Sequence, residues 1–260
     1  MIDPLMFIAL LPAVVLVVYI CRKDRTDKEP PALIAKLLGY GVLSCLPAIV
    51  VELILSAIIE RLNVRNAFLG YFLEAFVVAG LTEETCKFLF LRTTWRNPAF
   101  DYQFDAIVYA VMVALGFAAF ENVKYVYSYG FATGIVRAVT AVPGHAIFGV
   151  FMGYFYGYAK LSDYWGRNDD RKAYLALSVV VPVLMHGCYD FLAFTQESDS
   201  RFTLLFYAYL VALYVFGIRR VNRSSRDDRR VTRETVFDYF RRMQYPMPPQ
   251  YRDRNDDFWR

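Results

Sequence analysis

Two adjacent glutamates, Glu83 and Glu84, lie with Lys87 in an otherwise apolar stretch from about residue 67 to 91. A charged side chain at the centre of a bilayer costs at least about 2.5 to 3.5 kcal/mol, so a buried acidic pair indicates a function or a strong partner. In a helix, Lys87 lies one turn beyond both acids, at i,i+4 from Glu83 and i,i+3 from Glu84, so either carboxylate can pair with it. The spacing alone does not say which acid is left to react.

Further ionisable and amide side chains interrupt three later apolar stretches of the chain. They are Glu121 and Asn122 in the first, His145 in the second, and His186 with Asp190 in the third. His186 and Asp190 share one helical face at i,i+4. Depths estimated at about 1.5 Å per residue place these groups near mid-membrane or somewhat outward. We therefore predict a cavity that they line together with the acidic pair and Lys87.

Two acids and two histidines suit hydrolysis by an activated water, in which a carboxylate takes the proton and a histidine stabilises the oxyanion. The chain has no GxSxG or HExxH motif, so neither a serine nucleophile nor a zinc-protease helix is indicated. The same residue types could hold zinc through His145, His186 and Glu121, although without a diagnostic spacing. We expect catalysis without a metal or other cofactor, with Glu83 as the base and Glu84 held by hydrogen bonds.

Membrane-spanning helices must position these side chains. The chain has 260 residues, 57% of them hydrophobic, and its apolar runs are too long for a soluble core. These features predict an all-α, polytopic membrane bundle of about seven transmembrane helices. We place the spans at residues 4–21, 35–60, 67–91, 104–127, 130–160, 172–195 and 202–219.

Residues 1–219 are expected to form one transmembrane domain, with its motif-bearing core at about 67–195. Residues 220–260 read as a basic, partly disordered tail, with a short amphipathic helix near Val236 and Phe240. The net charge of +4 comes largely from basic residues beside the spans and in this tail, which favours membrane orientation over nucleic-acid binding. Their distribution predicts a multi-pass protein of the plasma membrane, with its N-terminus outside and its tail in the cytoplasm.

Two other classes of protein also bury acids and histidines. A proton-coupled transporter would use them as a relay, but the two halves of the chain show no convincing internal repeat. A non-catalytic membrane protein could keep such a cavity only to bind a partner. The complete set of polar residues argues against that alternative.

Three motifs, in this order along the chain, resemble the PrsW family of intramembrane proteases. They are Glu83-Glu84-x-x-Lys87, Phe117-x-x-x-Glu121 and His186-x-x-x-Asp190, together with Tyr125, the Pro-Gly-His segment ending at His145, and Gly153-Tyr154-x-x-Gly157. That family belongs to a superfamily with the type II CAAX prenyl endopeptidases. The resemblance covers roughly residues 67 to 195.

The resemblance implies a glutamate-dependent endopeptidase that cuts a peptide bond within or beside the membrane. In bacteria the substrate of such an enzyme is typically an anti-sigma factor. Carried over to this chain, Glu83 or Glu84 would activate water, His145 and His186 would assist, and Glu121 and Asp190 would orient the histidines. The tail lies outside the resemblance, and the substrate is not identified by it.

Overall fold

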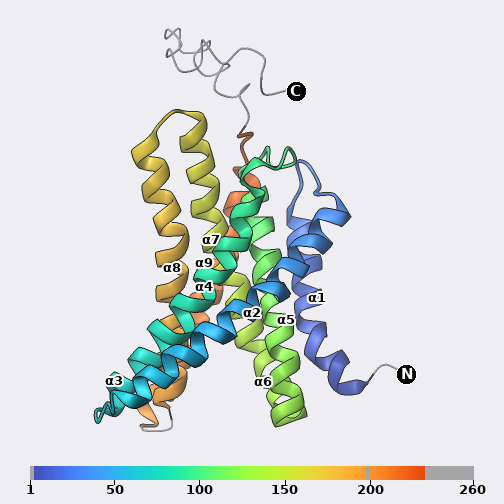
Figure 1. The fold of residues 1–260 in the computed structure, drawn as a ribbon. Coiled ribbons are helices and arrows are strands. Elements are labelled where there is room, and N and C mark those ends of the chain that lie inside the picture. Colours follow the sequence, from blue (N-terminus) through green and yellow to red (C-terminus); the bar gives the residue numbers. More distant parts are fainter. Residues whose placement is uncertain (1–2, 197–198, 232–260) are drawn as a thin grey trace, which may run out of the picture.

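The protein is an all-helical bundle in the computed structural model, which describes residues 3–196 and 199–231 (Figure 1). Six helices within these residues are long and apolar enough to cross a membrane. The predicted fold class is therefore confirmed. The amphipathic segment expected near Val236 and Phe240 lies outside the described residues.

The helical elements follow one another with short connections. The α-helices are α1 (Pro4–Lys23), α2 (Pro31–Arg61), α3 (Ala67–Phe72), α4 (Thr82–Leu91), α5 (Asp105–Tyr129), α6 (Phe131–Val139), α7 (Ala141–Tyr164), α8 (Asn168–Thr195) and α9 (Arg201–Arg226). A π-helix, η1 (Leu73–Leu81), joins α3 to α4, and a 3-10 helix, η2 (Arg92–Arg96), follows α4.

Local sequence explains where several helices begin and end. Asp3 caps α1, because its carboxylate accepts a hydrogen bond from the Leu5 amide and Pro4 occupies the first turn. Asn66 caps α3 in the same way. Gly130 separates α5 from α6 with a φ of 86°, a backbone conformation that favours glycine.

Helix α5 forms the centre of the bundle, and every residue from Asp105 to Ala118 is buried. Helices α1, α2 and α7 pack around it (Figure 1). The glycines of α7 meet α5 so closely that a Cβ on Gly153 would lie 2.3 Å from the Ala106 carbonyl oxygen. Gly41 of α2 and Gly116 of α5 allow a similarly close crossing.

Two predicted spans differ from the structure. The stretch at 67–91 is helical throughout but consists of α3, η1 and α4, so it is not one uniform α-helix. The stretch at 130–160 is two helices, because the backbone breaks at Thr140 between α6 and α7. Hydropathy did not reveal either change, since both occur inside apolar sequence.

Part of the predicted tail belongs to the folded structure. Helix α9 continues to Arg226, past the predicted end of the span at residue 219. The residues after it pair with the connection that leads into α5: the Val231 amide donates to the Asp101 carbonyl, and the Gln103 amide donates to the Arg229 carbonyl. The side chain of Val231 is fully buried.

Candidate active site

The first turn of α4 brings the two adjacent glutamates into the protein interior. Glu84 is 0% exposed, Glu83 6% and Lys87 1%, although the sequence around them is that of a membrane-facing helix. The preceding element η1 is π-helical, and its wider turns change the direction in which the following side chains point. Gly187 of α8 makes room for this segment, because a Cβ there would lie 2.3 Å from the Phe76 ring.

Lys87 lies at the centre of the buried polar cluster. Its ammonium nitrogen is 3.0 Å from Glu83 Oε2, 2.7 Å from Glu84 Oε1 and 3.1 Å from His145 Nδ1. It also lies 4.0 Å from the centre of the Phe117 ring. The three hydrogens of an ammonium group match these three polar neighbours.

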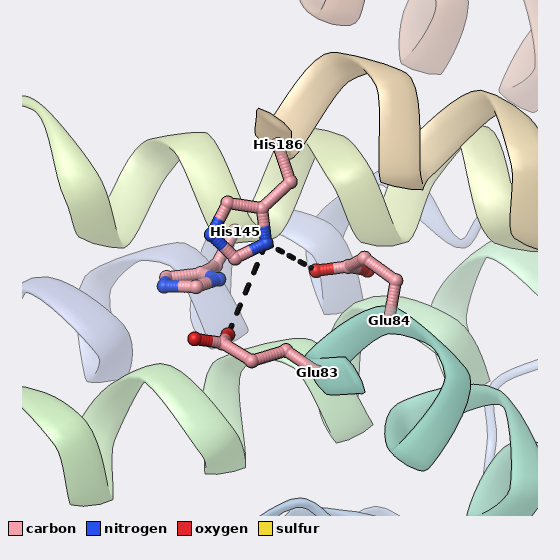
Figure 2. A group of neighbouring side chains, drawn as sticks. All are labelled: Glu83, Glu84, His145 and His186. Atoms are coloured by element: carbon pink, nitrogen blue, oxygen red, sulfur yellow. Dashed lines mark hydrogen bonds and ion pairs between the residues drawn. The ribbon is translucent and has the colours of Figure 1, made fainter. Parts of the chain in front are cut away.

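His186 connects the acidic pair to α8. Its Nδ1 lies 3.0 Å from Glu84 Oε1 and 3.9 Å from Glu83 Oε2, and Figure 2 shows this nitrogen facing both carboxylates. Its Nε2 lies 3.2 Å from Asp190 Oδ2, one turn further along α8. A ring with a carboxylate at each nitrogen donates to both when it carries two protons, which is the imidazolium form.

His145 of α7 contacts a second set of polar groups on α5 and α6. Its Nε2 lies 3.0 Å from Glu121 Oε2, and the same oxygen is 2.8 Å from Arg137 Nη2. Asn122 is fully buried, with its amide nitrogen donating to the Ala9 carbonyl and its oxygen accepting from Arg137 Nε. The rings of His145 and His186 lie 5.2 Å apart between centres, so the two sets form one site.

A cavity of about 340 Å³ lies against this cluster. Its wall includes Glu83, His145 and His186, but Glu84 and Lys87 do not line it. The members of the wall beyond the predicted set come from α2, η1, α5, α6, α7 and α8; among them are Glu52, Ser56, Glu74, Phe120, Lys124, Arg137, Phe148 and Phe194. The cavity therefore extends toward the end of the bundle that carries the connections α2–α3 and α8–α9.

The structure brings every predicted site residue into this one region. The predicted partners also meet: Lys87 with both acids, His186 with Asp190, and Glu121 with His145. Sequence reasoning missed Arg137 and Glu74. Arg137 is a cation in a long apolar run, and the cost of placing such a group in a membrane could have pointed to a carboxylate partner.

A family model described as "PrsW family intramembrane metalloprotease" matches residues 29–218. The chain belongs to the PrsW family. The three motifs predicted this membership. The matched region extends well beyond them, because it begins before α2 and ends within α9. As a member of this family, the multi-pass membrane protein is a peptidase. This membership argues against the transporter alternative.

Several bacterial proteins named "Protease PrsW" are similar to the chain over most of its length. The protein from Bacillus subtilis (strain 168) is 34% identical over 214 residues, which cover 82% of this chain and 92% of the relative. The one from Oceanobacillus iheyensis is 34% identical over 215 residues, with coverage of 82% and 93%. The protein from Clostridioides difficile (strain 630) is 28% identical over 232 residues, with coverage of 87% and 94%. No solved structure matches the chain.

The word metalloprotease in the family description raises the question of whether this site fits a metal ion. Glu83, Glu84, His145 and His186 each offer one ligand atom, and these atoms lie within 4.8 Å of one another. This group contains both adjacent acids and, among the described residues, leaves out Glu121, which the sequence suggested as a ligand. Glu84 Oε2 is buried and has no hydrogen-bond partner within the described part of the chain.

The position of Lys87 decides the fit. Its ammonium group lies within hydrogen-bond distance of three of the four residues that would hold the ion. A metal ion bound by the same atoms would meet a positive charge about 3 Å from its own ligands, and the repulsion between cations at such a distance in a buried site is severe. With Lys87 in this place, the four residues do not fit a metal ion.

Proposed function

We propose that the protein is an intramembrane endopeptidase that hydrolyses a peptide bond of a membrane protein with a glutamate-activated water. One observation carries this proposal: of the two adjacent acids, only Glu83 lines the cavity, and it does so beside both histidines. Glu84 is enclosed by Lys87 and His186 and has no access to a substrate. The arrangement supports the assignment of Glu83 as the base.

Hydrolysis requires a base for the water, positive charge near the oxyanion and a proton for the departing amine. Glu83 removes a proton from water as the water oxygen attacks the carbonyl carbon of the substrate. The doubly protonated ring of His186 supplies positive charge near the oxyanion that forms, with His145 assisting from α7. The carbon–nitrogen bond then breaks, and the departing amine takes the proton held by Glu83. Lys87 and Glu84 hold the base and His186 in place.

The cavity wall supports a substrate that enters from the bilayer. Ile49 and Leu53 on α2 and Phe120 on α5 line it, and Leu53 is 67% exposed on the apolar surface. A transmembrane helix that unwinds between α2 and α5 could bring its backbone to Glu83. The family resemblance suggests an anti-sigma-factor type of protein as the substrate. The distribution of Lys and Arg suggests an N-terminus outside the cell, and the cavity would then extend toward the outer side.

A reconstituted cleavage assay with a transmembrane substrate tests this proposal. We expect Glu83→Gln to lower kcat by about 10²- to 10⁴-fold, as the loss of a general base does, without unfolding the protein. Glu60→Gln is the matched control, because Glu60 is an exposed glutamate of α2 that does not line the cavity. A chelator should leave the wild-type rate unchanged. Full activity in Glu83→Gln, or loss of activity with the chelator, would contradict the mechanism.

A further inference from the structure

Arg137 of the short helix α6 binds one face of α5 behind His145. Its guanidinium donates to Glu121 Oε2 at 2.8 Å and to Asn122 Oδ1 at 3.0 Å, and it lies 4.0 Å from the centre of the Tyr125 ring. The orientation of the Asn122 amide is fixed, because its nitrogen donates to a carbonyl of α1. Arg137 therefore has acceptors on two sides and an aromatic face on the third, and its side chain is only 14% exposed.

The bonds to Glu121 decide which nitrogen of His145 carries the proton. Arg137 stays protonated in proteins, so the oxygen that it binds at Glu121 is held in the ionised form, which only accepts hydrogen bonds. The same oxygen lies 3.0 Å from His145 Nε2, which must then be the donor. On the other side of the ring, Nδ1 faces the ammonium group of Lys87, which only donates. His145 consequently has its proton on Nε2 and a free electron pair on Nδ1.

We infer that Arg137 is a positioning residue for peptide-bond hydrolysis: through Glu121 it fixes the tautomer of His145, and His145 in turn helps to hold Lys87 against the acidic pair. This inference rests on the proposed function. Without Arg137, Glu121 would lose the permanent counter-charge that contacts its carboxylate. A protonated Glu121 could donate to Nε2, which would move the ring proton to Nδ1 and point it at the Lys87 ammonium.

The position of Arg137 depends on how α6 packs against its neighbours. This helix begins at Gly130 and packs against α1 through Gly134, where a Cβ would lie 3.0 Å from the Val126 side chain and 3.4 Å from that of Ile8. Its outward face is apolar and exposed. The polar cluster is therefore connected, through Arg137, to the short helix α6, whose position depends on its contacts at Gly134.

Histidine NMR tests the inference without any need for turnover. The chain has two histidines, so ¹⁵N-histidine labelling of the full-length protein gives two ring systems, and a His186→Gln variant assigns them. We expect the wild-type His145 to be neutral with its proton on Nε2. In Arg137→Gln we expect the ring to shift to the Nδ1–H form or to take up a second proton, whereas Arg137→Lys, which keeps a positive charge beside Glu121, should retain the wild-type tautomer.

Kinetics give the second measurement. Arg137→Gln should lower kcat by about 10- to 100-fold, with little change in KM. Losses of this size are typical when a residue that fixes the orientation of a functional histidine is removed. Arg137→Lys should recover part of this loss. Arg65→Gln removes an exposed positive charge from the α2–α3 connection and should leave both kcat and the NMR spectrum unchanged.

Several results would overturn the inference. A wild-type His145 with its proton on Nδ1, or on both nitrogens, would do so even if Arg137→Gln failed to fold. An unchanged tautomer and an unchanged kcat in a folded Arg137→Gln would do so as well. If the wild type cleaves no transmembrane substrate, the proposed function fails, yet the NMR result still decides whether Arg137 sets the proton on His145.

Discussion

At the scale of single residues, the site is a cluster of opposite charges that pair with one another inside the bundle. Glu83, Glu84, Glu121 and Asp190 face Lys87, Arg137 and the ring of His186 at distances of 2.7 to 3.2 Å. Removing one partner from such a cluster leaves an uncompensated charge, which typically costs about 3 to 5 kcal/mol. The cluster thus explains how two adjacent acids persist in an apolar helix.

Lys87 gives the sharpest residue-scale prediction, because it stands where a metal ion would share its ligands. In Lys87→Met the donor atoms of Glu83, Glu84 and His145 lose their ammonium partner. We expect this variant to be destabilised by about 3 to 5 kcal/mol and to bind zinc, whereas the wild type binds none stoichiometrically. Elemental analysis after dialysis against zinc measures the metal, and thermal unfolding with and without zinc measures the stabilisation it provides.

Lys36→Met is the control for this experiment, since Lys36 is an exposed lysine near the start of α2. It should neither bind zinc nor unfold at a lower temperature. One zinc ion per wild-type molecule, lost in a His145→Ala variant, would show that Lys87 does not exclude the metal.

At the scale of elements, close helix crossings hold the cavity wall against the catalytic helices. Gly116 on α5 faces Gly41 on α2, and a Cβ on Gly116 would lie 2.1 Å from the Leu38 carbonyl oxygen. Gly116→Ala must push α2 away from α5, and overpacking of this kind typically costs about 1 to 3 kcal/mol. Because α2 supplies part of the cavity wall, we expect both the unfolding temperature in detergent and kcat to fall.

Gly39→Ala is the matched control for the crossing. It lies on α2 close to Gly41, yet nothing lies within 4 Å of its Cβ position. Alanine favours a helix over glycine by up to about 1 kcal/mol, so this variant should be as stable as the wild type or slightly more stable. Equal stability of the two alanine variants would mean that the crossing is not tight.

The sequence predicted which elements converge but not how their backbones bend. Helical spacing and the cost of buried charge were enough to bring Glu83, Glu121, His145 and His186 to one cavity. They could not reveal the π-helix η1, in which Phe76 packs closely over Gly187 of the distant helix α8. The break at Thr140 was missed for a related reason: hydropathy stays high through both α6 and α7, and the prediction did not use Pro143, which lies in the first turn of α7, as a sign of a helix start. Arg137 was missed because its role depends on that break.

At the scale of the whole molecule, the two ends of the bundle differ. The catalytic cavity extends toward the end that carries the α2–α3 and α8–α9 connections. At the opposite end, residues 227–231 pack against the connection into α5 and close the structure. Buried acids gather here: Asp24 is 3% exposed, and Glu29 accepts a hydrogen bond from the Tyr109 hydroxyl at 2.8 Å.

This closed end should make stability depend on pH. Burial raises the pKa of Asp24 to about 6, with repulsion from Asp228 adding to it. Burial likewise raises the pKa of Glu29 to about 7, with repulsion from Asp24 adding to it. The folded state therefore binds these protons more tightly than the unfolded state, where the ordinary values are 3.8 and 4.5. The resulting stabilisation is complete below about pH 4 and is lost as the pH rises through 6 and 7.

We therefore expect the unfolding temperature of the wild type in detergent to fall between about pH 5 and pH 8, by roughly 2 to 4 °C for each kcal/mol lost. The double variant Asp24→Asn/Glu29→Gln removes both titrating groups, so its unfolding temperature should change less over the same range. Asp169→Asn, which alters an exposed acid at the start of α8, should follow the wild type. A wild type that becomes more stable toward pH 8, or a double variant with the same slope, would show that these two acids are ionised at no cost to the fold.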